Sequence, residues 1–390
     1  MIFFCEINKT GFEHATANKQ LLALLARTFP GSVIQARISQ SHWQAISDGV
    51  DTTDIEPLFE EVIAPETGNK WRWISKLLNE CKRAFAILRA AQNKKVKLVF
   101  FASSSPLGNL FISLLSRFVF KKCKVVITLH GELQLLRSRG GKAVDRVYAL
   151  CLRKAFSMKV TNQRYLILDK YICDRLLAYG LIPSERVMAI RHPLTHKQLS
   201  SNEPIPEKKV VFGHLGVAKV DKHSPLFFDL ARRFQSEVSK GLASFVVAGQ
   251  VLDEMLPFTN QWVEYSEAGE LLTNDAYLAR CKGMQYAVFF YDDKGYELIS
   301  SGAIMDAISF GIPIIGLRNP YFTHLFEQCQ IPPGILCDDF NGFCEVVRKL
   351  ITTDEYNYEQ MKTGMRLLKS KFDFGQIQVD FSSQLHGFLN

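Results

Sequence analysis

The segment Tyr291–Leu317 (YDDKGYELISSGAIMDAISFGIPIIGL) constrains the fold more than any other part of the sequence. An apolar run of strand length, Tyr286–Tyr291, leads into it. Apolar residues then recur at helical spacing over Ala303–Phe310, and a second apolar strand begins at Pro313. A Ser pair before the helix and a Gly after it fit a helix cap and a helix stop. The pattern predicts a parallel β–α–β unit whose helix begins near Ser300–Gly302.

The start of this helix, at Ser300, Ser301 and Gly302, is a candidate anion site. A helix start in the loop after a parallel strand offers unpaired backbone N–H groups and the positive end of the helix dipole to an anion. Asp306 lies five residues past Ser301, where it can accept hydrogen bonds from a pair of sugar hydroxyls. The residues therefore suit a diphosphate joined to a sugar. A buried α/β unit with an ordinary helix cap is the alternative reading.

The run DAISFGIPII, Asp306–Ile315, resembles the E-A-x-x-x-G-x-P-V-I segment of nucleotide-sugar-dependent glycosyltransferases with the two-domain GT-B fold. The similarity is to the large group that carries an E-x7-E motif. In that family the second acidic residue holds the nucleotide ribose, and the preceding loop and helix start hold the diphosphate. The resemblance implies the ribose role for Asp306. The first Glu of the motif touches the donor sugar; Leu298 stands at that position here, and the adjacent Glu297 is the candidate substitute.

A second segment, Gly213–Lys219 (GHLGVAK), resembles the G-R-L-x-x-x-K segment of the same family. The Arg and Lys of that segment embrace the donor diphosphate. The resemblance implies donor binding by His214, Gly216 and Lys219, with His214 at the place where Arg is usual. Lys222 could serve in place of Lys219 if the loop is longer than in the family.

Candidate catalytic residues follow two strands of the first half. A strand that ends in Thr-Leu-His places its His beside the donor sugar in the family, which implies that role for His130, with Glu132 as the nearest carboxylate. The loop Asn8–His14 follows the first strand, at the edge where open α/β folds bind ligands. Its G-x-E-H-A pattern resembles the family's first loop, so Glu13 and His14 are further candidates. A helix cap and a surface His are the alternative for these two.

The order of predicted elements indicates an α/β protein with two Rossmann-like domains facing across a cleft, the GT-B architecture. A chain of 390 residues is long enough for two domains of ordinary size. We expect an acceptor-binding domain over residues 1–197, a nucleotide-sugar-binding domain over 198–372, and a tail over 373–390 that packs back on the first domain. The polar stretch Leu194–Lys209 has the composition of a linker.

Positive charge is concentrated in the first half of the chain, residues 1–200, which holds twice as many basic as acidic residues. Within the region Lys70–Lys124, Glu80 is the sole acidic residue. This region begins with a predicted amphipathic helix, Lys70–Gln92, that carries two Trp residues near its start and a stripe of Arg72, Lys76 and Arg83. The combination suits an anionic membrane surface. A core-packing helix with a solvated basic face is the alternative.

Several motifs and segments that the sequence lacks narrow the class of protein. Nine scattered cysteines without C-x-x-C spacing favour free thiols in a reducing cytosol. The N-terminus turns polar after Ile7, as a first strand does and a signal peptide does not. The apolar stretch Leu98–Phe120 is interrupted by Ser-Ser-Ser-Pro and divides into a strand and a helix. Asp292–Asp293 do not form a D-x-D motif, so we expect neither a metal nor a cofactor besides the sugar nucleotide.

Together these features predict a metal-independent, hexosyltransferase-like glycosyltransferase in surface polysaccharide biosynthesis. It would move a sugar from a nucleoside diphosphate-sugar to a hydroxyl of a lipid-linked glycan, as a cytoplasmic protein peripheral at the inner face of the membrane, with no nucleic acid as partner. An inverting reaction needs a general base such as Glu13, His14 or Glu132, whereas a retaining one does not. The alternatives are a sugar-nucleotide epimerase of the same fold and a non-catalytic basic module that binds membrane or nucleic acid.

Overall fold

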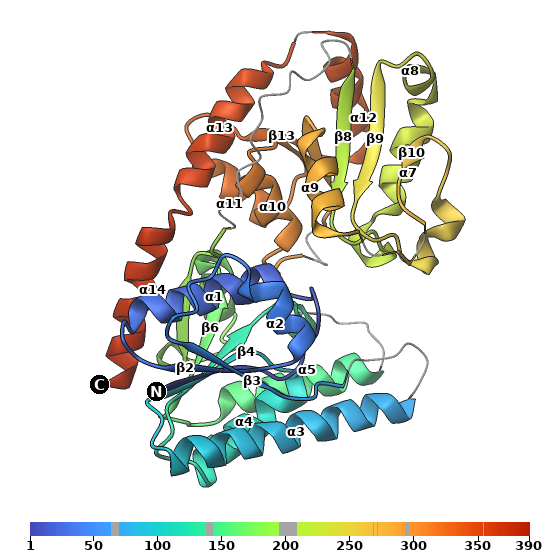
Figure 1. The fold of residues 1–390 in the computed structure, drawn as a ribbon. Helices are drawn as coiled ribbons and strands as arrows, with labels where there is room; N and C mark the ends of the chain where they lie inside the picture. Colours follow the sequence, from blue (N-terminus) through green and yellow to red (C-terminus); the bar gives the residue numbers. More distant parts are fainter. Residues whose placement is uncertain are drawn as a thin grey trace. The chain divides into compact units, whose positions relative to one another are not determined.

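The computed structural model describes residues 1–63, 70–137, 143–194, 209–267, 269–270, 272–292, 296–353 and 355–390, with the backbone alone for residues 70–73. The chain forms two compact units (Figure 1). Unit 1 comprises Met1–Pro193, Leu298–Ser300 and Asp373–Asn390, and unit 2 comprises Leu194–Glu297 and Ser301–Phe372. Each unit is built on a parallel sheet, which confirms the predicted α/β fold with two Rossmann-like domains. The expected domain boundary at 197/198 lies outside the described residues.

Unit 1 contains a seven-stranded parallel sheet in the order β3-β2-β1-β4-β5-β6-β7. Its strands are β1 (Ile2–Glu6), β2 (Ile34–Ile38), β3 (Ile55–Phe59), β4 (Leu98–Ser103), β5 (Val125–Leu129), β6 (Gln163–Leu168) and β7 (Val187–Ile190). Its helices are α1 (Ala15–Thr28), α2 (Gln40–Ser47), α3 (Lys70–Asn93), α4 (Pro106–Phe118), α5 (Ala143–Ser157), α6 (Lys170–Ala178) and α14 (Phe374–Leu389), with a short 3-10 helix η1 (Gly131–Leu136) after β5.

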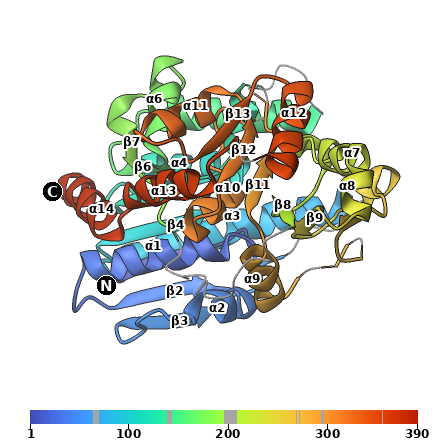
Figure 2. The same cartoon turned by 90° about the horizontal axis from the view of Figure 1, so that it is seen from above.

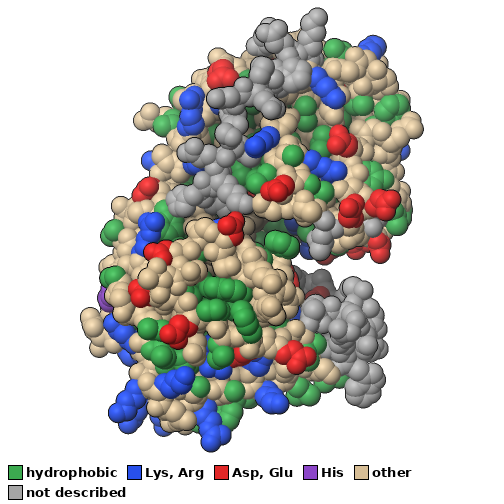
Figure 3. Space-filling view, in the orientation of Figure 1, with side chains coloured by type: hydrophobic (Ala, Val, Ile, Leu, Met, Phe, Trp, Pro, Cys, Tyr) green, Lys and Arg blue, Asp and Glu red, His purple; other side chains and the backbone are tan. Residues whose placement is uncertain are grey.

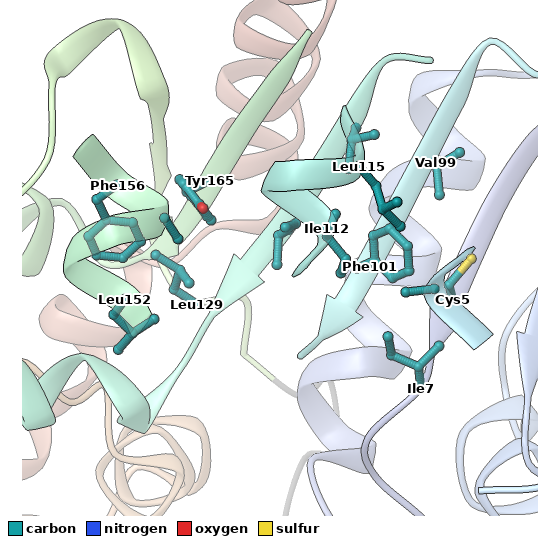
Figure 4. Packing of buried hydrophobic residues seen from close by; sticks show 14 of the residues in the cluster. Cys5, Ile7, Val99, Phe101, Ile112, Leu115, Leu129, Leu152, Phe156 and Tyr165 are labelled. Atoms are coloured by element: carbon teal, nitrogen blue, oxygen red, sulfur yellow. The ribbon is translucent and has the colours of Figure 1, made fainter. Parts of the chain in front are cut away.

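The strand side chains of unit 1 alternate between two apolar layers. On β1, Phe3 and Cys5 face the layer formed with α3, α4, α5 and α6 (Figure 4), whereas Ile2 and Phe4 face the layer formed with α1, α2 and α14. Successive side chains of a strand point to opposite faces, so a sheet covered on both faces reads as a continuous apolar run. Strands β4 (LVFFAS) and β5 (VVITL) are accordingly almost continuous apolar runs and are fully buried.

Helix α14 belongs to the core of unit 1 although it follows unit 2 in the sequence. Figures 1 and 2 show it beside α1, and its residues Phe381 and Leu385 are fully buried in the layer that α1 also covers. The Gln384 amide exchanges hydrogen bonds with the backbone of Ala189 on β7, at 2.9 Å in both directions. Lys124 donates a hydrogen bond of 2.8 Å to the Phe388 carbonyl oxygen. The helix is thus joined to the sheet by apolar and polar contacts.

Unit 2 contains a six-stranded parallel sheet in the order β10-β9-β8-β11-β12-β13. Its strands are β8 (Val210–Leu215), β9 (Ala243–Ala248), β10 (Val263–Glu264), β11 (Tyr286–Phe289), β12 (Ile314–Leu317) and β13 (Gly334–Cys337). Its helices are α7 (Pro225–Arg233), α8 (Gln235–Ser239), α9 (Asn274–Lys282), α10 (Gly302–Phe310), α11 (Pro320–Glu327), α12 (Phe340–Thr352) and α13 (Tyr358–Ser370).

Both sheets have a point at which the strand order reverses direction, between β1 and β4 in unit 1 and between β8 and β11 in unit 2. In open parallel sheets, ligands bind beside the carboxyl ends of the strands at such a point. The loops that follow β1 and β4, and those that follow β8 and β11, therefore mark one candidate site in each unit.

No helix in the described part of the chain is long and apolar enough to cross a bilayer. The apolar stretch Leu98–Phe120 is divided between β4 and α4, as predicted. Ser105 lies at the break, where its hydroxyl accepts a hydrogen bond of 3.1 Å from the Gly108 N–H and caps α4.

Candidate functional site

A buried carboxylate, Glu6, organises the carboxyl edge of unit 1. Its Oε1 accepts hydrogen bonds from the backbone N–H groups of Asn8 (2.8 Å) and Lys9 (2.9 Å) and from the Ser103 hydroxyl (2.6 Å). Its Oε2 accepts a hydrogen bond of 2.8 Å from the Asn18 amide. A register shift between Cys5 and Glu6 sets Glu6 opposite Ser103, which brings these groups together. Glu6 therefore fixes the start of the first loop and is saturated by structural hydrogen bonds.

A second buried carboxylate, Glu80 of α3, fixes the loop that follows β4. It accepts hydrogen bonds from the Ser105 N–H (2.7 Å), the Ser105 hydroxyl (2.6 Å) and the Ser104 hydroxyl (3.2 Å). A Cβ at Gly108 would lie 2.3 Å from Glu80 Oε1, so this glycine makes room for the carboxylate at the start of α4. Burial raises the pKa of Glu80, and the serine donors counteract part of that effect. The lone acidic residue of the basic region, Glu80, therefore has a structural role, because it holds the loop that follows β4.

Two predicted histidines, His14 and His130, meet edge to face with ring centroids 4.4 Å apart. His14 precedes α1 in a left-handed backbone conformation (φ 59°), which turns its ring from the first loop toward β5. His130 Nε2 donates a hydrogen bond of 2.9 Å to the Ala102 carbonyl oxygen, so Nδ1 is left as an acceptor. Burial lowers the pKa of His130 to about 4, and burial followed by the nearby His130 lowers that of His14. Both rings are neutral at physiological pH and are weak bases.

Glu132, on η1, has the protonation equilibrium that a general base requires. Burial raises its pKa to about 7, while hydrogen bonds from the backbone N–H groups of His130 and Glu132 itself counteract the rise. Among the described residues, no hydrogen-bond partner reaches its buried Oε1. An acid–base group is most effective when its pKa is near the working pH. Among His14, His130 and Glu132, Glu132 has the pKa nearest to neutral pH, and its catalytic role stays a prediction.

A pocket of about 390 Å³ opens at this edge of unit 1. Its lining brings His14, His130 and Glu132 together, as the sequence predicted. The remaining lining residues are Asn8, Lys9, Lys76, Leu77, Ser103, Ser104, Ser105, Pro106, Gly131, Leu135 and Tyr148. Glu13 does not line the pocket; it lies on an exposed turn and forms an ion pair with Lys9. Glu13 is thus not among the residues that line the pocket, and its catalytic role stays a prediction.

In unit 2, helix α10 begins at Gly302 with Ser301 at the N-cap and ends at Gly311 in a left-handed conformation (φ 70°), as its sequence indicated. The Ser301 side chain does not cap the helix; its hydroxyl lies 3.2 Å from the Tyr291 hydroxyl. A Cβ at Gly302 would meet no heavy atom within 4 Å, and Gly302 is exposed. The Ser301 side chain therefore leaves the first N–H groups of α10 uncapped, and there is space beside Gly302, as an anion would require.

The end of β8 approaches the start of α10 at Gly216. A Cβ at Gly216 would lie 3.5 Å from Ala303 Cβ of α10 and 3.8 Å from the ammonium nitrogen of Lys222. Gly216 has φ 78°, a conformation that glycine adopts without strain. Gly249 packs so closely that its own Cβ would lie 2.1 Å from the Gly216 carbonyl oxygen. Close backbone contacts thus place a Lys222 cation near the open end of α10.

Lys222 fits the role of the diphosphate cation better than His214 or Lys219 does. Burial, followed by the charge of Lys219, lowers the pKa of Lys222 to about 8, so its amine remains mostly protonated at neutral pH. Lys219 is more exposed, and its amine lies 4.0 Å from Asp221. Sequence reasoning gave Lys222 only a secondary place, because Lys219 keeps the family spacing.

His214 is buried, and it cannot supply the positive charge that its sequence position suggested. Its Nε2 lies 2.9 Å from the Ser224 hydroxyl, and its ring packs edge to face on Phe227 at 5.6 Å between centroids. Burial, followed by the charge of Lys222, lowers the pKa of His214 to about 3. The neutral ring instead connects β8 with the loop that carries Lys222, since Ser224 also accepts a hydrogen bond of 3.0 Å from the Lys219 N–H.

Asp306 lies partly buried on α10, where its Oδ2 accepts a hydrogen bond of 2.7 Å from the Tyr277 hydroxyl of α9. Within the described ranges no hydrogen bond reaches its Oδ1, which is left for a further donor. Burial raises the pKa of Asp306 to about 6, with the Tyr277 hydrogen bond acting in the opposite direction. The carboxylate is therefore mostly ionised at pH 7 and able to accept a hydroxyl hydrogen bond. Its predicted ribose role stays a prediction.

The segment before α10 is divided between the two units. Leu298, at the position of the first motif Glu, is fully buried in the apolar core of unit 1, and its N–H donates a hydrogen bond of 2.9 Å to the Gln134 side chain. Glu297 is 7% exposed. The Ser300 hydroxyl is buried, and no described residue gives it a hydrogen-bond partner. The donor roles of Glu297 and Ser300 stay predictions, and Leu298 has a structural one.

Within the residues that the structure describes, no group of three or more His, Cys, Asp or Glu side chains could hold a metal ion. The expected metal independence stays a prediction.

Solved structures of glycosyltransferases with the GT-B fold are similar to this chain over nearly its whole length. HepE of Anabaena, solved with UDP and glucose, matches with a TM-score of 0.65 and 11% identity over 99% of each chain. Sucrose-phosphate synthase from Thermosynechococcus elongatus matches with a TM-score of 0.69 and 10% identity, covering 99% of this chain and 98% of that one. A glycosyltransferase from Rickettsia africae matches with a TM-score of 0.62 and 9% identity, covering 99% of this chain and 97% of that one. No protein-family model and no curated protein sequence matches. The chain therefore has the GT-B fold.

Proposed function

We propose that this protein is a glycosyltransferase that moves a sugar from a nucleoside diphosphate-sugar to a hydroxyl of a glycan acceptor. The observation that carries the proposal is the open start of α10 beside Lys222, at the point where the strand order of unit 2 reverses. Backbone N–H groups, a helix dipole and an ammonium group converge there on one place, as a diphosphate requires. The UDP bound in a structure of the same fold, HepE, supports the choice of a nucleotide ligand.

In the proposed complex, the N–H groups near Ser301 and Gly302 hold the diphosphate, and Asp306 accepts a hydrogen bond from the ribose. As the bond from the sugar carbon to the diphosphate oxygen breaks, negative charge grows on the leaving diphosphate. Lys222 stabilises that charge through a fixed ammonium group in a partly buried place. The roles of Gly216 and Gly249 are structural, because their missing Cβ atoms let β8, β9 and α10 approach one another.

The acceptor is assigned to the pocket of unit 1. We assign Glu132 as the group that takes the proton from the attacking hydroxyl, while the acceptor oxygen forms its bond to the sugar carbon and the diphosphate leaves. His130 and His14 lie in the same pocket as neutral hydrogen-bonding groups. A general base on the acceptor belongs to a single displacement, so the product sugar is expected with inverted configuration at its reacting carbon.

A membrane-bound acceptor is supported by the outer surface of α3, α4 and α5, which pack side by side. This surface, the α3–α5 face, exposes nine large apolar side chains: Ile74, Leu78, Phe85, Leu114, Phe118, Val119, Val144, Val147 and Leu150. Exposed basic residues stand among them: Lys82, Arg89, Lys94, Lys95, Arg117, Lys121, Lys122, Arg146, Arg153 and Lys154. Figure 3 shows Lys and Arg side chains gathered at the lower edge of unit 1, where Figure 1 draws α3 and α4.

Apolar side chains among clustered cations fit an anionic lipid surface. We therefore propose peripheral binding at the cytoplasmic face of a membrane, with a lipid-linked glycan of surface polysaccharide biosynthesis as acceptor. Some predicted basic residues do not belong to this surface, and Lys76 is one of them because it lines the pocket of unit 1. Arg83 is buried and pairs with Glu60 at 2.9 Å, and Lys124 is held on α14. The Trp side chains at residues 71 and 73 lie outside the description.

The proposal is tested by the thermal stability of the protein in the presence of UDP. A ligand at about 100 times its dissociation constant adds roughly 2.7 kcal/mol to the stability of the state that binds it. We expect UDP to raise the melting temperature of the wild type, and Asp306→Ala to abolish that increase. Asp275→Ala, a change at an exposed acidic residue of α9 in the same unit, is the matched control.

An unchanged UDP response in Asp306→Ala would contradict the ribose assignment, and no response in the wild type would contradict the proposed function. Turnover of a UDP-sugar then separates the enzyme classes, because a transferase releases UDP whereas an epimerase keeps the nucleotide on the sugar.

A further inference from the structure

Two lysines line the pocket of unit 1 and are not explained by the mechanism proposed above. Lys9 follows β1, and its backbone N–H is fixed by Glu6. Lys76 projects from α3 and is partly buried. In the described part of the chain, no hydrogen bond or ion pair engages the Lys76 ammonium group. A partly buried ammonium group without a partner loses hydration and gains nothing in return, so it needs a further explanation.

Three carboxylates, Glu13, Glu80 and Glu6, act on Lys76 through their charge, but none of them lines the pocket. The Glu6 carboxylate accepts four hydrogen bonds and Glu80 three, all from groups that shape the two loops. Glu13 is paired with Lys9 on the exposed turn. Glu132 has a pKa of about 7, so near neutral pH much of it carries no charge. Two lysines and one carboxylate line the pocket, so its lining carries more positive than negative charge.

The two ammonium groups also act on each other. Burial, followed by the positive charge of Lys9, lowers the pKa of Lys76, while the charges of Glu13, Glu80 and Glu6 act in the opposite direction. Like charges kept together beside a pocket are stabilised when an anion enters between them. The volume of about 390 Å³ is within the range of small-molecule sites.

We propose that this pocket recognises an oxyanion on the acceptor, a phosphate or a carboxylate, through hydrogen bonds from the Lys76 and Lys9 ammonium groups. The inference rests on the proposed function and adds the chemical class of the acceptor. A phosphate would come from a lipid carrier, whereas a carboxylate would come from an acidic sugar. Either oxyanion would sit beside Glu132, with the acceptor hydroxyl presented to that carboxylate.

The test is calorimetric titration of the full chain, saturated with UDP so that the diphosphate site of unit 2 is filled. Two matched pairs of probes are used: geranyl phosphate with geraniol, and glucuronate with glucose. The variants are Lys76→Met, which keeps the length of the side chain without its charge, and Lys76→Arg, which keeps the charge. Lys159→Met is the control, since Lys159 is an exposed lysine of unit 1 that lines neither the pocket nor the α3–α5 face.

In the wild type, at least one anionic probe is expected to bind about tenfold or more tightly than its neutral counterpart, the effect of one charge-assisted hydrogen bond. Lys76→Met should remove that preference, while Lys76→Arg and Lys159→Met retain it. Preference for geranyl phosphate identifies a lipid phosphate, and preference for glucuronate identifies an acidic sugar.

The inference is overturned if anionic and neutral probes bind equally, if none binds at millimolar concentration, or if Lys76→Met keeps the preference. UDP binding, measured first, separates the two proposals. An absence of UDP binding would contradict the proposed function. A preference for the anionic probe that does not depend on Lys76 would contradict only the proposal of an anionic acceptor.

Discussion

Replacing Asp306 by Asn is expected to stabilise unit 2 while it weakens nucleotide binding. Asn has nearly the same shape as Asp, and its carbonyl oxygen can still accept the hydrogen bond from Tyr277. What the substitution removes is the negative charge on a partly buried group. The increase in the free energy of unfolding of the Asp306→Asn variant therefore measures how strongly this charge, which the proposed ligand site needs, destabilises the unit.

The magnitude follows from the pKa of Asp306, which burial raises from 3.8 to about 6. A raised carboxyl pKa means that the folded protein disfavours the ionised form. The cost is absent below the unfolded pKa and complete above the folded one. Each pKa unit corresponds to about 1.36 kcal/mol, so the cost above pH 7 is about 3 kcal/mol. At pH 5 it is roughly half that value. Asp306→Asn should recover these amounts.

Native-state hydrogen exchange of unit 2 peptides is the suitable assay, because it reports the free energy of unfolding of one unit in a chain that need not unfold in a single step. Asp229→Asn is the control, for which the opposite change in stability is expected. Burial raises the pKa of Asp229, but hydrogen bonds from Arg232 and Arg233 outweigh burial and lower it overall, so removing that charge should destabilise the fold at neutral pH. A stability gain in Asp306→Asn that is zero, or equal at pH 5 and pH 7.5, would refute the reasoning.

Three further expectations concern the proposed reaction. Lys222→Met should weaken UDP binding about tenfold or more. The affinity of the wild type for UDP should also fall as the pH rises past about 8, where the Lys222 amine loses its proton. Titration calorimetry between pH 6.5 and 9 measures both effects. Glu132→Gln should lower kcat by about 10²-fold or more. The kcat of the wild type should rise with pH through about 7, because a general base acts in its deprotonated form. A product sugar with retained configuration would exclude Glu132 as the general base. Phe118→Glu with Leu78→Glu should reduce flotation with anionic vesicles and leave UDP binding unchanged, whereas unaltered flotation would exclude the α3–α5 face as the membrane contact.

The sequence was most informative where local signals decide the structure. Helix α10 begins and ends where Ser301 and Gly311 indicated, because an N-cap and a left-handed glycine are local features. Most strands were recognisable because parallel strands covered on both faces are largely apolar, whereas β10, a two-residue strand at the edge of its sheet, was not predicted. Alternation of these signals was enough to predict two parallel α/β units.

The sequence was least informative where a side chain's burial depends on packing between elements. His214 has the position of a family cation, yet Phe227 and Ser224 from the next loop and helix enclose it. Lys222 reaches Gly216 because the loop turns back at His223, which has a left-handed backbone (φ 55°). A left-handed non-glycine residue carries no reliable sequence signal, so spacing alone favoured Lys219.

Charge pattern was a partial guide to the basic region of unit 1. It indicated a helix rich in Lys and Arg, but three of its members have different environments. Arg83 is buried against Glu60, Lys76 lines the pocket, and Lys82 is exposed. Residues three or four apart share one side of a helix, but whether that side meets core, ligand or solvent is decided by neighbouring elements.

The placement of α14 has a consequence for biosynthesis. Phe374, Ile377, Phe381, Leu385 and Phe388 fill one apolar layer of unit 1, yet they are translated only after all of unit 2. While the ribosome makes unit 2, the nascent unit 1 carries an open apolar face over α1, β4 and β7, a feature that invites aggregation or chaperone binding. Unit 2, whose described residues come from an almost unbroken stretch of chain, can complete its core first. The half of the protein that is synthesised first is therefore expected to be the last to finish folding.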